Sequence, residues 1–244
     1  MNPRKRNRAV GLSAIVVLVV ALMAGAVSAQ NAEVDGRLAA LKTSLETSKK
    51  QLTTYQWIET TVVSVNGEQQ SREQDQCYYG ADGGLQKVPI AGQTESKEQP
   101  HGPLGRPGLR GRMAERQSAD VEAYMKQAVA LVKQYVPPDP KTLQARASAG
   151  KLSVNPIEPG KRVRLDFHDY AKSGDVMGVE IDLTNNHLLG LTVSTYIQDP
   201  SDAVSLKVVF KTLNDGSTYP ASTVLNAPAK KVTVDVENTG YRKM

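Results

Sequence analysis

The sequence predicts an α+β fold, namely a strongly curved antiparallel β-sheet that forms an unclosed half-barrel, with helices packed on its concave apolar face. Three observations lead to this prediction. Strand-like runs rich in β-branched residues occupy 55–90 and 161–238. The turns between them are short, which implies antiparallel neighbours, because a parallel crossover needs about a dozen residues. Amphipathic segments at 33–54 and 118–135 need an apolar surface to cover.

The first 29 residues have the three parts of a secretory signal peptide. MNPRKRNR is a basic n-region, AVGLSAIVVLVVALMAGAVSA is an apolar h-region, and Val27-Ser28-Ala29 is a small-residue cleavage pattern. We therefore expect cleavage after Ala29 and a periplasmic or secreted protein, with no transmembrane segment left after cleavage. The alternative is an uncleaved N-terminal helix that anchors the protein, because the apolar run has about the 20 residues that a spanning helix needs.

The net charge has little to do with the mature protein. The formal charge is +5, but the signal peptide carries four basic residues and no acidic one, which leaves +1 for residues 30–244. With no basic strip interleaved with aromatic residues, nucleic-acid binding has no support. The remaining length fits a single α+β domain. A flexible loop near 92–117, rich in glycine, proline and arginine, is expected to interrupt it.

The first element of this domain is expected to be a helix over residues 33–54. Its apolar residues recur at steps of three and four, so they make one stripe. The stripe consists of Val34, Leu38, Leu41, Leu45 and Leu52. Such a helix must lie on a core, because the stripe is unfavourable in water.

The next elements are predicted to be a hairpin and a short third strand. YQWIETTVVSV (55–65) is β-branched and aromatic, and EQQSREQDQCYY (68–79) is its polar return strand. Asn66-Gly67 between them predicts a type I′ turn, since both central residues of that turn need positive φ. LQKVPI (85–90) continues the meander.

The middle of the chain is expected to hold a loop and two helices. The loop 97–116 is either a solvated linker or a contact for lipid or a partner. A helix is predicted over 118–135, with Ser118 as its N-cap. Asp139-Pro140 has the pattern of an N-cap followed by proline at the first helical position, so a third, short helix is expected to end near Gly150.

The C-terminal meander can be tested by register, because side chains alternate between the two faces of a sheet. One set of pairings keeps the same face apolar over four strands, and the alternation of Val232, Val234 and Val236 extends it. These pairings are Tyr170 with Val176, Leu183 with Leu189, and Ile197 with Val204. Agreement between several elements is stronger evidence than any single propensity.

We predict that any hydrophobic ligand lies on this apolar face, because small-molecule sites are concave and mostly apolar. The alternative is an ordinary packed core without a cavity. The candidate ligand-lining residues are Val163, Leu165, Phe167, Val179, Ile181, Leu191, Val193, Val208 and Phe210.

The same register places charged residues on the opposite face. It sets Arg164 opposite Asp182, Asp166 opposite Glu180, and His168 opposite Gly178. Asp166, His168 and Glu180 suggest a metal or acid–base site, but arginines beside them compete for the carboxylates, and metal sites usually need three or four ligands in a dry surround. We favour a solvated face, on which the like-charge pair of Asp166 and Glu180 has no clear physical explanation.

The sequence contains no signature of a known catalytic site. It has no G-x-S-x-G, H-E-x-x-H or Walker motif, and its three histidines are scattered. The single Cys77 cannot form an intramolecular disulfide, so it is either a buried, inert thiol or an intermolecular partner. We therefore expect a protein that is not an enzyme and that uses no metal or other cofactor.

Two functions fit these patterns. The first is an exported bacterial envelope protein that carries or binds a lipid, an acyl chain or another hydrophobic ligand. The second is a structural or protein-interaction module of the cell envelope, with a filled core and no ligand, which binds an envelope protein through the loop 97–116 or a sheet edge.

The order of elements resembles the LolA-like superfamily of lipoprotein carriers. A signal peptide and a long amphipathic helix precede the hairpin YQWIETTVVSVNGEQQSREQDQCYY, helices follow, and an antiparallel meander ends in YPASTVLNAPAKKVTVDVENTGYRK. The resemblance implies a bent antiparallel sheet capped by helices around an apolar cavity for acyl chains. No cavity residue of the family aligns with a particular residue here, so none is transferred.

Overall fold

The computed structural model of the chain describes residue 36 and residues 39–90, 95–96, 123–132, 134–136 and 138–244. The strands are β1 (Tyr55–Val65), β2 (Glu68–Tyr79), β3 (Leu85–Pro89), β4 (Glu95–Ser96), β5 (Leu152–Glu158), β6 (Arg162–His168), β7 (Val176–Asp182), β8 (His187–Tyr196), β9 (Ala203–Thr212), β10 (Thr218–Ala227) and β11 (Val232–Lys243). Helices cover 39–52, 123–132 and α3 (Pro140–Ser148), and a 3-10 turn, η1, covers Pro228–Lys230.

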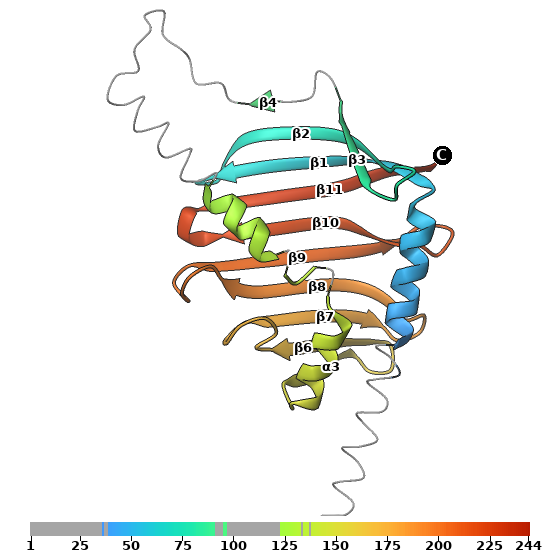
Figure 1. Cartoon of the computed structure of the whole chain (residues 1–244), viewed down its shortest axis with the longest axis vertical. Coiled ribbons are helices and arrows are strands. Elements are labelled where there is room, and N and C mark those ends of the chain that lie inside the picture. The colour runs from blue at the N-terminus through green and yellow to red at the C-terminus, as the bar shows by residue number, and fades with distance from the viewer. Residues whose placement is uncertain (1–35, 37–38, 91–94, 97–122, 133, 137) are drawn as a thin grey trace, which may run out of the picture.

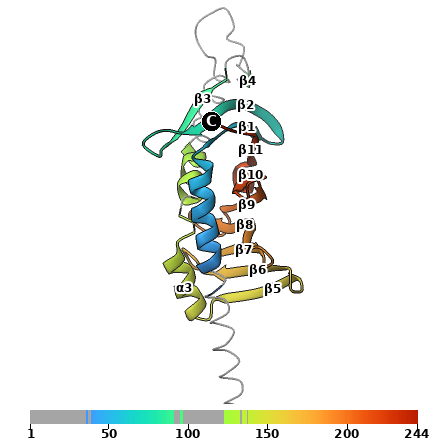
Figure 2. The ribbon, with the colours of Figure 1, turned by 90° about the vertical axis from the view of Figure 1, so that its right-hand side faces the viewer.

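The predicted fold class is confirmed by the arrangement of these elements. The strands form one open antiparallel sheet in the order β3-β2-β1-β11-β10-β9-β8-β7-β6-β5, with β4 beside β2. The helices lie against one face of this curved sheet (Figures 1 and 2), which we call the concave face. The predicted signal peptide (1–29) and most of the predicted loop near 92–117 lie outside the described residues.

The N-terminal hairpin forms as predicted. Asn66 and Gly67 both have positive φ, at 56° and 80°, as a type I′ turn requires. The link from this hairpin to the C-terminal meander was not predicted. β1 pairs with β11 along its whole length, so that Val63 faces Val234 and Val65 faces Val232. This pairing makes one continuous sheet out of the two ends of the chain.

The helices cover the concave face through their apolar sides. Leu41 of the first helix, Leu131 of the second and Leu143 of α3 belong to the same buried cluster as the inward residues of the sheet. Asp139 caps α3 as predicted, because its carboxylate accepts hydrogen bonds from the first backbone N–H groups of the helix. None of the helices in the described ranges has the length and apolar character needed to cross a bilayer.

The predicted register of β6 and β7 is wrong by two residues. His168, rather than Tyr170, faces Val176, and Leu165 faces Val179. A shift of two residues keeps every side chain on the same face of the sheet, so the apolar and polar layers are as predicted. The shift removes the unexplained like-charge pair, because Asp166 faces a glycine.

The next two pairings also differ from the prediction. Thr195, rather than Ile197, faces Val204. A β-bulge beside Glu180 leaves Leu189 as an extra residue of β8, so Leu189 does not face Leu183. The bulge could not be foreseen from alternation, because a bulge adds one residue to one strand only.

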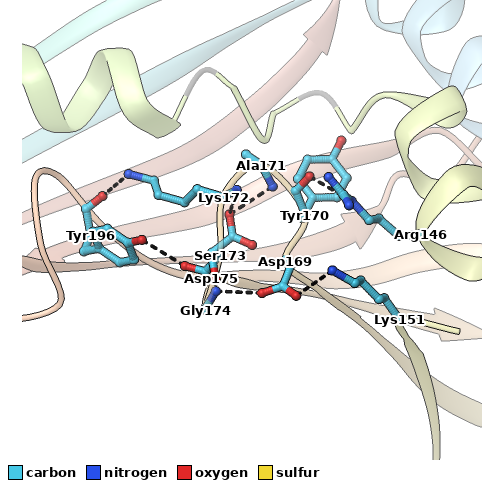
Figure 3. Close-up of polar contacts among 10 residues, drawn as sticks. All are labelled: Arg146, Lys151, Asp169, Tyr170, Ala171, Lys172, Ser173, Gly174, Asp175 and Tyr196. Carbon is cyan, nitrogen blue, oxygen red and sulfur yellow. Dashed lines mark hydrogen bonds and ion pairs between the residues drawn. The ribbon is translucent and has the colours of Figure 1, made fainter. Parts of the chain in front are cut away.

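A long turn over residues 169–175 explains the shift between β6 and β7 (Figure 3). The backbone N–H of Asp169 donates to the carbonyl of Asp175 at 2.9 Å, and the Asp169 carboxylate accepts from Gly174 at 2.6 Å. Asp175 Oδ2 accepts from the backbone N–H groups of Ala171 and Lys172 at 3.0 and 2.8 Å. The two carboxylates hold a turn that is longer than the sequence pattern suggested.

The strand β5 was not predicted. Its sequence LSVNPIE contains Pro156, which cannot donate to a strand ladder and suggests a loop. The proline is tolerated because β5 is the last strand of the sheet, where a missing N–H leaves only the edge unpaired.

Candidate functional site

The nine predicted ligand-lining residues lie on the concave face, under the helices. Eight of them are at most 7% exposed and belong to the main hydrophobic cluster, and Phe210 is half-buried at its margin. The eight are Val163, Leu165, Phe167, Val179, Ile181, Leu191, Val193 and Val208. Their shared face and burial are therefore established, whereas their contact with a ligand stays a prediction.

A group of aromatic rings continues this face at the corner of the sheet where β1 begins and β11 ends, beside the C-terminus (Figure 1). We call it the aromatic cluster. The Trp57 ring stacks on Tyr241 at 5.3 Å between centroids, with 9° between the planes, and Tyr219 lies 4.3 Å from Tyr241. Tyr79 lies 5.7 Å from Trp57, and Tyr55 lies 6.3 Å from Tyr241.

Strand alternation places Tyr55 and Trp57 on the concave face, and Tyr79, Tyr241 and Tyr219 join them through the ring contacts. Trp57 is separated by an even number of residues from Val63 and Val65, which pack on the main core. A register shift in the pairing of β1 with β11, between Gln56 and Ile58, lies beside Trp57. Trp57 and Tyr55 are buried, whereas Tyr79, Tyr219 and Tyr241 are only partly buried. The cluster is therefore more accessible than the core beneath the helices.

Three tyrosine hydroxyls of the cluster have no hydrogen-bond partner within the described residues; they belong to Tyr79, Tyr219 and Tyr241. Burial raises the pKa of Tyr79 and Tyr241, and the pKa of Tyr241 is raised further by the neighbouring Tyr219. Tyr79 and Tyr241 therefore stay neutral at physiological pH, and a neutral phenol can both donate and accept hydrogen bonds. Trp57, in contrast, donates its indole N–H to Asn238 at 3.0 Å.

Cys77 lies beside the cluster, directly across the β1–β2 ladder from Trp57. It is fully buried, as expected for an inert thiol, and its sulfur forms no disulfide. Burial, together with the Glu59 carboxylate, raises the pKa of the thiol to about 11. Lys87, which is ion-paired with Glu59, opposes this rise only in part.

Cys77 is expected to react slowly with thiol reagents in the folded protein. At pH 8 a thiol with this pKa is roughly one part in a thousand thiolate, and the thiolate is the reactive form. A disulfide reagent such as DTNB should therefore react slowly with the native protein and release one equivalent of thiol per chain once denaturant is added. Stoichiometric reaction of the native protein within minutes would contradict this placement.

A hydrogen bond from Tyr55 connects the aromatic cluster with the turn between β9 and β10. Its hydroxyl donates to Asp215 Oδ2 at 2.7 Å, while the Ser217 hydroxyl donates to Oδ1 at 2.6 Å. The pKa of Asp215 is lowered from 3.8 to about 2, mainly by the hydrogen bond from Ser217, then by the hydrogen bond from Tyr55 and by the nearby charge of Lys243. The carboxylate is thus held in its charged form.

This lowered pKa predicts a specific loss of stability in acid. Asp215 contributes stability that is fully present above about pH 4 and is lost as the pH falls towards 2, because the unfolded chain binds the proton first. Asp215→Asn should therefore lose less stability than the wild type between pH 5 and 2. In Ser217→Ala, the Asp215 pKa measured by NMR titration should move towards 3.8. An unchanged pKa would show that the Ser217 contact is not what lowers it.

The residues of the enzymatic alternative do not share a site. Asp166 accepts from Arg164 Nε at 2.7 Å, and Glu180 is ion-paired with Arg162. The His168 ring lies 3.0 Å from a serine hydroxyl of β5. Throughout the described part of the chain, no three His, Cys, Asp or Glu side chains are grouped closely enough to hold a metal ion.

Sequence reasoning missed the aromatic cluster because its members come from opposite ends of the domain. Tyr55, Trp57 and Tyr79 belong to the first hairpin, whereas Tyr219 and Tyr241 belong to the last two strands. Only the pairing of β1 with β11 brings them together. The available signal was the four aromatic residues of the first hairpin, Tyr55, Trp57, Tyr78 and Tyr79; strand alternation alone does not connect them with Tyr219 and Tyr241.

Comparisons with known proteins give three similar structures. A LolA superfamily protein from Nitrosomonas europaea has a TM-score of 0.34 and 9% identity over 83% of this chain and 93% of its own. A DUF1329 family protein from Desulfovibrio piger has a TM-score of 0.35 and 8% identity over 84% of this chain and 92% of its own. MucB, in its complex with MucA(peri), has a TM-score of 0.22 and 11% identity over 84% of this chain and 98% of its own.

Neither a protein-family model nor a curated protein sequence matches the chain. The TM-scores are too low to carry an argument about function, and the identities of 8–11% do not establish a family. A member of the superfamily that the order of elements resembles is nonetheless among the solved structures to which this chain is similar.

Proposed function

We propose that this chain is an exported bacterial envelope protein that binds or carries a lipid, an acyl chain or another hydrophobic ligand on its concave face, without catalysis. The observation that carries the proposal is the aromatic cluster. It extends the apolar core to a place where Tyr79, Tyr219 and Tyr241 are only partly buried and keep free hydroxyls. Partly exposed rings with a few polar groups are typical of small-molecule sites.

The proposed ligand lies with its polar end at the tyrosine hydroxyls. Its apolar part extends along the predicted lining residues, among them Leu165, Phe167 and Val193. Because these residues are buried under the helices, the helices must separate from the sheet for the ligand to reach them. Binding would then replace helix–sheet contacts by ligand–sheet contacts of similar apolar character.

The test combines lipid analysis with a matched pair of variants. Tyr79 and Tyr78 are neighbours on β2 and therefore point to opposite faces of the sheet. Protein purified from cells should yield lipid by mass spectrometry, and delipidated protein should bind a fluorescent fatty-acid probe. We expect Tyr79→Ala to weaken probe binding about ten-fold, a change of about 1.4 kcal/mol, and Tyr78→Ala to leave it unchanged.

The second candidate function, a structural or interaction module with a filled core, is favoured by one observation. Eight of the nine predicted lining residues are almost completely buried by protein. Delipidated protein that binds no acyl probe, together with an absence of co-purified lipid, would support this candidate and contradict the carrier. Cross-linking in cells would then be expected to recover an envelope protein.

The proposed location is periplasmic or secreted, with cleavage after Ala29. The intact mass of the exported protein should correspond to residues 30–244. A mass that includes the first 29 residues, in a membrane fraction, would instead support the uncleaved anchor.

A further inference from the structure

The convex face of the sheet, opposite the helices, contains a hollow of about 620 Å³ over β6, β7, β8 and β9. Its location follows from alternation, because its members Arg164, Gly178, Thr192 and Lys207 alternate along their strands with buried residues of the core. This hollow is therefore separate from the aromatic cluster, because the two lie on opposite faces of the sheet and over different strands.

Two glycines on adjacent strands line the hollow. Gly178 of β7 faces Thr192 of β8, and Gly190 of β8 lies between Glu180 and Val209. The space above Gly178 is filled by the side chains of Arg164, Thr192 and Asp166, so only Gly190 interrupts the row of side chains across the sheet. Around Gly190 there is room, because an added Cβ would have no heavy atom closer than 3.6 Å.

Two β-bulges border the hollow. One lies between β7 and β8 and leaves Leu189 as the extra residue, and the other lies between β9 and β10, next to Phe210. Bulges bend a strand and redirect side chains, and they are frequent beside binding sites. As a result, Leu189 lines a face that is otherwise polar, and Val209, which faces Gly190 and alternates with the buried Val208, lies on the same face.

The charges around the hollow are predominantly positive. Arg162 is ion-paired with Glu180, and Arg164 Nη2 donates to the Thr192 hydroxyl at 2.9 Å while its Nε is bonded to a carboxylate. Lys207, on the opposite wall, has no ion-pair partner within the described residues and is exposed. Because Arg162 and Arg164 are paired with Glu180 and Asp166, Lys207 supplies the net positive charge that favours a negatively charged group in the hollow.

We propose that this hollow is a second binding site, which takes a single-chain anionic amphiphile. The Lys207 ammonium contacts the anionic head group, and the two arginines are within the same lining. The apolar chain lies over Gly190 against Leu189 and Val209. The volume is within the range of about 300–1,000 Å³ that is typical of small-molecule sites.

Laurate is the probe for this site, with dodecanol as the uncharged ligand of equal chain length and acetate as the charged ligand without a chain. Isothermal titration should show that laurate binds at least about ten-fold more tightly than dodecanol or acetate. Dodecanol lacks the charge that contacts Lys207, and acetate lacks the apolar chain. The amide signals of Gly178 and Gly190 should shift on addition of laurate. If acetate binds as tightly as laurate, or if neither glycine signal shifts, the proposal is wrong.

Two variants with one control place the ligand. Lys207→Glu should weaken laurate binding at this site about ten-fold, and Gly190→Val should abolish it by filling the space over Gly190. Lys211→Glu is the control, because it makes the same change of charge on the same strand. Lys211 is exposed on β9 but does not line the hollow. Unchanged laurate binding in both variants would overturn the proposal.

The outcome is distinguishable from a failure of the proposed carrier function. Tyr79→Ala should leave the glycine shifts intact, because the aromatic cluster is on the other face. Conversely, Lys207→Glu should leave acyl-probe binding at the aromatic cluster intact. Loss of one signal without the other therefore assigns each ligand to one face of the sheet.

Discussion

Replacement of Asp175 by alanine is expected to reduce the free energy of unfolding by about 3–5 kcal/mol. Asp175 is 0% exposed, and its Oδ2 accepts hydrogen bonds from the Tyr135 hydroxyl at 2.6 Å and from two backbone N–H groups of the turn 169–175. Hydrogen bonds to a charged acceptor contribute about 1.5–3 kcal/mol each, and buried donors left without a partner add a penalty. Water that enters the turn can replace some of these hydrogen bonds, and the lower end of the expected range corresponds to such replacement.

The turn also connects the sheet to the second helical segment. Tyr135 is fully buried. Its hydroxyl donates to Asp175 Oδ2 and also lies 2.8 Å from the Thr195 hydroxyl. Burial, together with the hydrogen bond to Asp175, raises the pKa of Tyr135, so the phenol remains a neutral donor. The loss in Asp175→Ala should therefore be accompanied by weaker packing of Tyr135, which near-UV circular dichroism can follow.

Graded variants separate this network from general damage to the turn. Asp175→Asn keeps the acceptor and the shape, so it should cost less than alanine, about 1–3 kcal/mol. Ser173→Ala changes an exposed side chain of the same turn and should stay within about 0.5 kcal/mol of the wild type. Urea unfolding measures all three. A loss below about 1 kcal/mol in Asp175→Ala would show that the carboxylate does not hold the turn.

The faces of the sheet could be predicted from the sequence except at the bulge of β8, where Leu189 lies on the polar face, whereas the exact pairings could not be predicted. Alternation assigns a side chain to a face, and a register error of two residues leaves that assignment unchanged. Leu165 and Val193 were therefore placed correctly although the pairings around them were wrong. The register depends on Asp169 and Asp175, whose hydrogen bonds inside one turn have no periodic signal.

The two candidate sites were largely hidden for a related reason. The aromatic cluster depends on the pairing of β1 with β11, a contact between segments far apart in the chain. The convex hollow depends on Gly190, which lies between Glu180 and Val209, and on the bulge that turns Leu189 to this face. Sequence patterns report local periodicity, so features made by long-range register escape them.

The second large effect is expected for Phe167→Ala. Phe167 is 0% exposed and faces Met177, which is also 0% exposed, so the alanine variant leaves a cavity inside the main cluster. Truncation of a buried phenylalanine typically costs about 3–5 kcal/mol, because the lost transfer energy is increased by the cavity. Val154→Ala is the control on the neighbouring strand, since Val154 is 49% exposed and should cost less than about 1 kcal/mol.

Measured in delipidated protein, this variant also tests how the concave face is used. If the free energy of unfolding falls by less than about 1.5 kcal/mol, the loss is no larger than the transfer of the side chain from protein to water, without a contribution from a new cavity. Phe167 would then border an existing cavity and not a packed core. A loss of the expected size means that the helices close over the sheet, so a ligand reaches Phe167 only when they separate. If such a variant still carries the wild-type amount of lipid, the ligand does not extend beneath the helices, and the aromatic cluster alone must hold it.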